Sequence, residues 1–259
     1  MKYFVVDAFT DKLFTGNPAG VCLLDEWPDS QIMQSIAAEN NLAETAFVVK
    51  RAKHYDLRWF TPQVEVDLCG HATLASAFVV HNFVDRDAAE MRFETKSGLL
   101  TVTKKEGLLE MDFPARKPVR TELTAQVAQA VNLPILEAHS SRDLFLLVEN
   151  EQLIKSFTPD FELLKQIQGY LGVVITAQGD EVDFVSRFFA PAIGVPEDPV
   201  TGSAHSSLIP FWGERLGKDK MLAKQLSPRG GTLYCENCGD RVKIAGKAVL
   251  YLQGEIRVQ

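Results

Sequence analysis

"DLCGHATLASAFVV", residues 67–80, joins a short polar segment to a run of almost entirely apolar side chains. The spacing predicts a helix over residues 71–80. It is apolar on every side, whereas a surface helix carries a polar stripe, so we expect protein to surround it. Gly70 and His71 stand at its N-terminus, where backbone N–H groups lack intrahelical partners and carry partial positive charge. Gly70 lets a ligand approach that backbone closely, and a carboxylate is the simplest anion to bind there.

The same pattern returns in the second half of the chain, at separations of 129, 132 and 133 residues. Three short motifs recur in one order: "RWFTP" (58–62) as "RFFAP" (187–191), "CGHA" (69–72) as "TGSA" (201–204), and "SGLLTV" (97–102) as "GGTLYC" (230–235). A nearly constant separation indicates an internal duplication. The alternative is that β-rich proteins reuse Phe, Pro and Gly freely.

Strand-like runs and helical segments alternate along both halves. Residues 2–9, 44–50 and 55–61 have the composition of strands, residues 28–41 have an apolar helical face, and residues 99–114 form a hairpin pattern around a Lys-Glu-Gly turn. The sequence therefore predicts an α+β protein of two duplicated lobes.

The boundary between the lobes is predicted in "PARKPVRTEL", residues 114–123, where two prolines and three basic residues interrupt the pattern. We assign residues 1–116 to an N-terminal lobe and residues 117–259 to a C-terminal lobe, and allow a terminal strand to cross to the other lobe. Each half is long enough to bury its own core. If a pseudo-twofold axis relates the lobes, both helix N-termini are expected to face one cleft.

Composition excludes several classes of function. The 259 residues carry a net charge of -7, which leaves no basic excess for nucleic acid. No apolar run reaches the ~20 residues of a membrane span, and the N-terminus lacks the features of a signal peptide, so we expect a cytoplasmic protein without a membrane partner. The four cysteines are too few for a disulfide scaffold, and "CENC" (235–238) has no second pair of ligands, so no metal site is predicted. Nucleotide-binding and serine-hydrolase motifs are absent from the sequence.

Three titratable side chains are candidate catalytic groups. Glu44 lies in "NLAETAFVV" among apolar neighbours, where partial removal from water suits a general acid/base, although a strand-end carboxylate turned to solvent fits the segment equally well. His71 is expected to be neutral because the helix dipole disfavours imidazolium, and it either relays a proton or caps the helix. Asp198 precedes a proline; it binds substrate, orients His71, or serves as a turn residue.

Four further residues are candidates for binding or catalysis. Asn17, in "TGNPAG", and Ser203 either contact a ligand or act as turn and capping residues. Cys69 is a candidate catalytic thiol, because a helix N-terminus lowers the pKa of a neighbouring thiol, or else a small buried filler. Its counterpart in the repeat is Thr201, so a mechanism that uses two thiols lacks its second base.

These motifs together resemble the PhzF-like family of phenazine-biosynthesis-type isomerases, and they cover almost the whole chain. The matching segments are "DAFT" (7–10), "GNPAGV" (16–21), "NLAETAF" (41–47), "RWFTPQVEVDLCGHAT" (58–73) and "FFAPAIGVPEDPVTGSAH" (188–205). The resemblance implies a fold like that of diaminopimelate epimerase, with two lobes, each a barrel-like sheet around a central helix, and a homodimer.

The resemblance also implies an activity: a cofactor-independent isomerase that moves a proton on a small carboxylate-bearing substrate. The family's catalytic glutamate falls on Glu44 and its paired glycines on Gly70 and Gly202, while its active-site His, Asp and Ser fall on His71, Asp198 and Ser203. Related epimerases carry a cysteine in each lobe, and Thr201 replaces the second one here. Two alternatives stay open: a racemase or epimerase that uses Cys69, and a catalytically silent carboxylate-binding protein.

Overall fold

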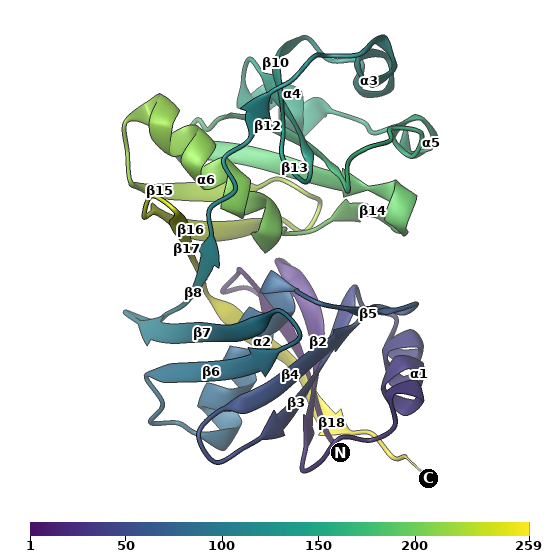
Figure 1. Cartoon of the computed structure of the whole chain (residues 1–259), viewed down its shortest axis with the longest axis vertical. Helices are drawn as coiled ribbons and strands as arrows, with labels where there is room; N and C mark the ends of the chain where they lie inside the picture. The colour runs from purple at the N-terminus through teal and green to yellow at the C-terminus, as the bar shows by residue number, and fades with distance from the viewer. Residues whose placement is uncertain (259) are drawn as a thin grey trace. The chain divides into compact units, whose positions relative to one another are not determined.

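The computed structural model describes residues 1–258 and divides into two compact units (Figure 1). Unit 1 comprises residues 1–112 and 245–259, and unit 2 comprises residues 113–244. The C-terminal segment therefore packs with unit 1, although the sequence analysis assigned it to the second lobe and only allowed for such a crossing. No helix within residues 1–258 is both long and apolar enough to cross a membrane.

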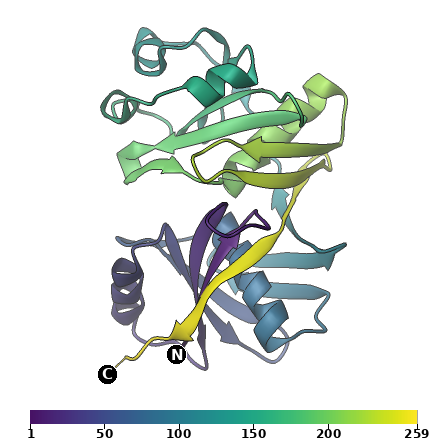
Figure 2. The same cartoon turned by 180° about the vertical axis from the view of Figure 1, so that it is seen from behind.

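Unit 1 contains one mixed sheet, the helices α1 (Ser30–Asn40) and α2 (Gly70–Val79), and a π-helical turn (Val80–Val84). Its strands are β1 (Lys2–Ala8), β2 (Asn17–Leu24), β3 (Glu44–Lys50), β4 (Tyr55–Phe60), β5 (Glu65–Val66), β6 (Glu90–Thr95), β7 (Gly98–Lys105), β8 (Leu108–Pro114) and β18 (Ala248–Glu255). They pair in the order β18–β1–β2–β3–β4–β6–β7–β8, with β5 on β4. Figure 2 shows β18 from behind, beside the N-terminal strands.

Unit 2 repeats this arrangement. Its helices are α3 (Ala125–Val131), α4 (Glu151–Ser156), α5 (Phe161–Leu164) and α6 (Gly202–Leu216), with a 3₁₀ turn at Pro191–Ile193. Its strands are β9 (Val119–Arg120), β10 (Ile135–Ser140), β11 (Leu144–Val148), β12 (Val173–Gln178), β13 (Phe184–Ala190), β14 (Val195–Asp198), β15 (Lys220–Gln225), β16 (Gly231–Asn237) and β17 (Arg241–Gly246).

The strand pairings confirm the duplication that the repeated motifs predicted. In unit 1, β2 and β3 are parallel, as are β4 and β6, and antiparallel pairs lie between and beside them. In unit 2 the parallel pairs are β11–β12 and β13–β15, again with antiparallel neighbours. A parallel pair needs a crossover connection, and α2 and α6 are the crossovers in corresponding places. Both units are thus α+β, and they share one topology.

The apolar segment at residues 70–79 forms α2 as predicted. Eight of its ten residues are buried, and the helix packs against β1, β2 and β3. The other face of the unit 1 sheet is covered by α1, whose Met33, Ile36 and Ala37 pack on Phe47. Neither sheet is a closed barrel: among the described residues no pairing joins the outer strands β18 and β8 of unit 1. The barrel-like arrangement that the resemblance implied is therefore an open, mixed sheet around a helix.

The ends of α1 and the turn between β7 and β8 follow local rules, and the turn is the predicted one. Asp29 caps α1 by accepting a hydrogen bond from the Gln31 backbone, and Asn41 ends the helix in the left-handed conformation at φ 48°. Glu106 and Gly107 form the predicted hairpin turn between β7 and β8, and both have positive φ, as a tight primed turn requires.

Candidate functional site

Four of the predicted site residues meet at one end of α2 in unit 1. Glu44 is the first residue of β3 and Asn17 the first of β2, and these two parallel strands begin side by side. Cys69 is the N-cap of α2, and His71 is in its first turn. Because α2 packs against the same two strands, its N-terminus brings His71 to the point where they begin.

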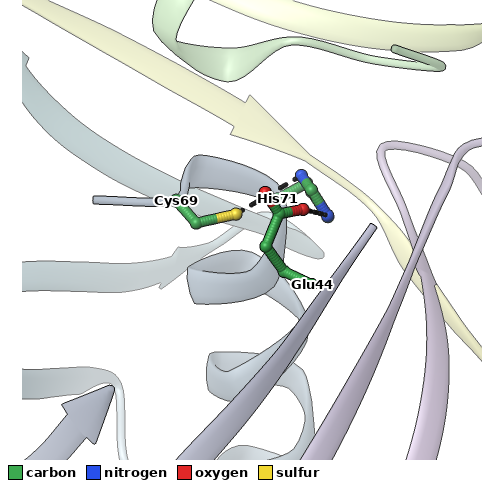
Figure 3. A group of neighbouring side chains, drawn as sticks. All are labelled: Glu44, Cys69 and His71. Atoms are coloured by element: carbon green, nitrogen blue, oxygen red, sulfur yellow. Dashed lines mark hydrogen bonds and ion pairs between the residues drawn. The ribbon is translucent and has the colours of Figure 1, made fainter. Parts of the chain in front are cut away.

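His71 is the centre of this group (Figure 3). Its Nε2 lies 3.1 Å from Oε2 of Glu44. Its Nδ1 lies 3.1 Å from Nδ2 of Asn17 and 3.5 Å from Sγ of Cys69. The contact with Glu44 satisfies the distance of an ion pair but not the direction of a hydrogen bond, so Nε2 has no hydrogen-bond partner within the described residues. We call Glu44, Cys69 and His71 the α2 triad.

The α2 triad is largely removed from water. His71 is 5% exposed, Cys69 is 7% exposed and Asn17 is fully buried, whereas the Glu44 side chain keeps 18% of its surface. Glu44 is therefore the member of the group through which solvent or a ligand is reached. The sequence left open whether this carboxylate turns to solvent; it faces the imidazole instead.

The structure corrects the expectation that His71 is neutral. Burial alone lowers the pKa of His71, but the Cys69 sulfur and the Glu44 carboxylate favour the imidazolium more strongly and raise the pKa well above its ordinary value. Sequence reasoning considered only the helix dipole, which acts at the same end of α2. The Cys69 sulfur and the Glu44 carboxylate, which both contact the ring, act in the opposite direction.

The expectation for Cys69 was wrong in the same way. Burial, followed by the charge of Glu44, raises the pKa of the Cys69 thiol, and the interaction with His71 does not offset this. The sequence analysis predicted that the helix N-terminus lowers this pKa if Cys69 is catalytic, and left a small buried filler as the alternative. A raised pKa reduces the fraction of thiolate, and the thiol form is a poor nucleophile or base.

The remaining predicted residues lie at the N-terminus of α6 in unit 2. Thr201, the N-cap, donates its hydroxyl hydrogen to Asp198 at 2.6 Å. Gly202 is the first residue of the helix, and the Ser203 hydroxyl accepts a hydrogen bond from Arg142 at 2.8 Å. The site residues are thus divided between the two units.

Two polar residues in unit 2 were missed by the sequence analysis. Gln225 accepts a hydrogen bond from the Thr201 backbone at 2.8 Å and donates to the Asp198 carbonyl at 2.7 Å. Arg142 contacts Ser203 from the turn before β11. Neither lies in a motif, and pairing of β15 with β13 is what brings Gln225 to this position, so no local signal identifies it.

Two further features, His205 and the "CENC" segment, carry titratable groups outside the predicted site residues. His205 is fully buried and its Nδ1 donates to the Thr201 carbonyl at 2.8 Å, while burial lowers its pKa to about 4. It is therefore a neutral core histidine. In "CENC", Cys235 is buried in β16 and Cys238 is exposed in the following turn. Among the described residues no disulfide joins the cysteines.

Two units of open mixed sheet, each built around a helix with a polar N-terminus, define the class of protein: an α+β protein of two duplicated units. A sequence profile for phenazine biosynthesis-like proteins matches residues 6–254. The chain belongs to that phenazine biosynthesis-like (PhzC-PhzF) family.

Known relatives agree with this assignment. A protein of Pseudomonas aeruginosa named as an uncharacterized isomerase is 48% identical, over all of this chain and 99% of its own length. The crystal structure of a PhzF family protein from Enterococcus faecalis has a TM-score of 0.97 and 48% identity, and covers 99% of both chains. A structure of a predicted epimerase from Pseudomonas aeruginosa has a TM-score of 0.77 at 19% identity, covers 100% of this chain and 99% of its own, and shares the fold alone. Because relatives that match the whole chain are named isomerases, the protein is an isomerase.

Proposed function

We propose that the protein is a cofactor-independent isomerase that moves a proton on a small carboxylate-bearing substrate, with Glu44 as the general base and acid. The observation that carries the proposal is the 3.1 Å contact between Oε2 of Glu44 and Nε2 of His71 in a largely buried group. A carboxylate with one open side and a histidine on the other is suited to accept a proton from carbon and return it.

The proton movement is a shift between two carbons of the substrate. Glu44 takes a proton from the substrate carbon next to a carbon–carbon double bond, and the electron pair of that C–H bond moves into the π system of the double bond. The same carboxyl group then delivers the proton to the carbon at the other end of the double bond. His71 stabilises the Glu44 carboxylate before the first step and after the second. The backbone N–H groups at Gly70 and His71 favour the substrate carboxylate. Atoms and charges balance without an external oxidant or reductant.

The test replaces the proton acceptor without changing its shape. Glu44→Gln is expected to lower the exchange of substrate hydrogen with deuterated water by about 10²–10⁴-fold, with substrate binding retained. The measurement is NMR of a panel of small amino and hydroxy carboxylic acids in D₂O. Glu90→Gln, a change at an exposed carboxylate of β6, is the control and should keep full exchange. Undiminished exchange in Glu44→Gln would reject the role of Glu44.

A second candidate function is a racemase or epimerase that uses Cys69. The 3.5 Å contact between its sulfur and Nδ1 of His71 favours it, because a histidine is the usual activator of a catalytic thiol. Its raised pKa and the hydroxyl of Thr201 in the corresponding place count against it. Cys69→Ala should therefore retain exchange; an enzyme silenced by this change is a thiol epimerase.

Other expectations from the sequence stay predictions. These are the contributions of Asp198, Gly202 and Ser203 to catalysis, a homodimer, a cytoplasmic location and the lack of a nucleic-acid partner. A catalytically silent carboxylate-binding protein stays the third alternative, and it would bind members of the acid panel tightly without any isotope exchange.

A further inference from the structure

The α2 triad brings together three kinds of metal-binding donor. One carboxylate oxygen of Glu44, the sulfur of Cys69 and a ring nitrogen of His71 all lie within 4.8 Å of one another (Figure 3). The sequence analysis predicted no metal site, because "CENC" has no second pair of ligands, and it did not bring Glu44, which lies on a different strand, together with Cys69 and His71. The third donor is supplied by the packing of α2 on β3.

The separations match those of ligands on a tetrahedral ion. A sulfur at about 2.3 Å and an imidazole nitrogen at about 2.0 Å from one Zn²⁺ lie about 3.5 Å apart. The Cys69 sulfur is 3.5 Å from Nδ1 of His71, and the Glu44 oxygen is 3.1 Å from Nε2. Because one ion takes only one ring nitrogen, an ion at Nδ1 beside Cys69 requires the Glu44 carboxylate, whose oxygen lies within 4.8 Å of the other donors, to turn toward it.

The site is largely closed to water. The His71 side chain is only 5% exposed, and its Nε2 faces the Glu44 carboxylate at 3.1 Å. Three protein donors also leave a fourth position open, as at zinc sites that take up water or another small ligand.

The donor set selects the class of cation. A soft thiolate with an imidazole favours Zn²⁺ and Co²⁺ over Mg²⁺ and Ca²⁺, which need several oxygen ligands. Binding forms a bond from the metal to the Cys69 sulfur and releases the thiol proton to solvent. No electron transfer is involved.

We propose that Glu44, Cys69 and His71 form a site for one divalent cation of the Zn²⁺ class, and that the bound cation silences the isomerase. The silencing part rests on the proposed function, because a carboxylate that is held by a metal no longer accepts a proton from substrate. The binding part does not depend on it.

The first experiment measures binding without any substrate. The purified full chain is treated with a chelator, freed of it, and titrated with Co²⁺, whose bond to a thiolate gives a charge-transfer absorption band. One Co²⁺ per chain and a band at saturation are expected. Cys69→Ser should abolish the band, and Glu44→Gln should weaken binding at least about tenfold.

The matched control addresses the other cysteines. Cys238→Ser removes the exposed thiol of "CENC" and should leave the band unchanged. A band that survives in Cys69→Ser, or that is lost in Cys238→Ser, would overturn the assignment, as would the absence of any Co²⁺ binding. Circular dichroism of each variant checks folding. If Cys69→Ser does not fold, protection of Cys69 from alkylation by Zn²⁺, located by mass spectrometry of the native chain, provides the same test.

The second experiment measures silencing. Zn²⁺ at one equivalent is expected to suppress isotope exchange at least about tenfold, and EDTA is expected to restore it. Exchange that is unchanged or stimulated at full metal occupancy would overturn silencing while leaving the site intact. If the native chain shows no exchange with any acid, the proposed function fails, and the Co²⁺ band still decides the site.

Discussion

Units 1 and 2 share one topology, but the main helix of unit 1 begins with a cysteine and a histidine where that of unit 2 begins with a threonine and a serine. The pairing of β3 with β4 places Phe47 opposite Arg58, and the pairing of β12 with β13 places Ile175 opposite Arg187. Glu44 lies three residues before Phe47, and Gly172 lies three residues before Ile175. Gly172 therefore occupies in unit 2 the position that Glu44 occupies in unit 1. In the helices, Thr201 and Ser203 take the places of Cys69 and His71.

The structure shows why the second copy lacks an acid. Gly172 is buried, and a Cβ at this position would overlap the ring of Phe188. A side chain at residue 172 would therefore meet the ring of Phe188. The scaffold is duplicated, whereas the acid at the start of the strand is present in one copy alone.

The framework itself is repeated down to one ion pair. Arg58 makes two hydrogen bonds to Glu65, at 2.7 and 2.9 Å, and Arg187 makes the same two to Glu197 at the same distances. The Arg58 guanidinium also lies over the ring of Phe60, and the Arg187 guanidinium lies over the ring of Phe189. Such fork-like pairs hold β4 to β5 and β13 to β14, the strands that lead to the helix N-termini.

The largest effect is expected from an acid introduced at the second copy. Gly172→Glu should lower the free energy of unfolding by about 3 kcal/mol or more, because it overfills the site beside Phe188 and buries an unpaired carboxylate. Urea unfolding measures this. Gly254→Glu in β18 is the control, since its nearest neighbouring atom lies 3.9 Å from a Cβ, and it should change stability by less than about 1 kcal/mol. Equal effects would show that Phe188 does not exclude the acid.

The two ion pairs should differ in strength. Arg187 is 7% exposed and also donates to the carbonyls of Ile154 and Phe157, so Arg187→Met should lower the free energy of unfolding by about 3–5 kcal/mol. Arg58→Met should lower the free energy of unfolding by only about 1–2 kcal/mol, because the Glu65 carboxylate still has an ion-pair partner, the Lys96 ammonium at 2.7 Å. Denaturant unfolding of both variants tests the comparison.

A double variant identifies the cause of that difference. Adding Glu197→Gln to Arg187→Met removes the carboxylate that is left without its partner, so part of the lost stability should return. If the two single variants lose the same stability, the deeper burial of the unit 2 pair has no energetic consequence.

The smallest effect concerns acid. Hydrogen bonding to the Arg58 guanidinium lowers the pKa of Glu65 against the opposing effect of burial, and Lys96 adds to the lowering. A lowered folded-state pKa stabilises the protein above the ordinary glutamate pKa, and this stabilisation is lost as the pH falls through the lowered value. Glu65→Gln should therefore flatten the acid side of the stability curve. Unfolding free energies measured from neutral to acidic pH check this; superimposable curves would contradict it.

The sequence by itself determined the architecture. The all-round apolar pattern at residues 71–80 predicted a buried helix, and three repeated motifs predicted two related α+β units, both of which the structure confirms. Caps, turns and strands could be predicted because their signals are local, extending over a few residues. Glu44, Cys69, His71 and Asn17 were also identified before the structure, as separate candidates.

Only the tertiary structure decided how those candidates act on one another. Pairing of β2 with β3, and packing of α2 on both, bring Glu44 to His71 across 27 positions of the chain. The Cys69 sulfur and that Glu44 contact reverse the expected direction of the pKa shift for His71, and burial reverses it for Cys69. In unit 2, pairing of β15 with β13 puts Gln225 against Thr201 without any motif. Periodicity in a sequence indicates which side of an element is buried, but the neighbours that set charge and solvation come from distant segments.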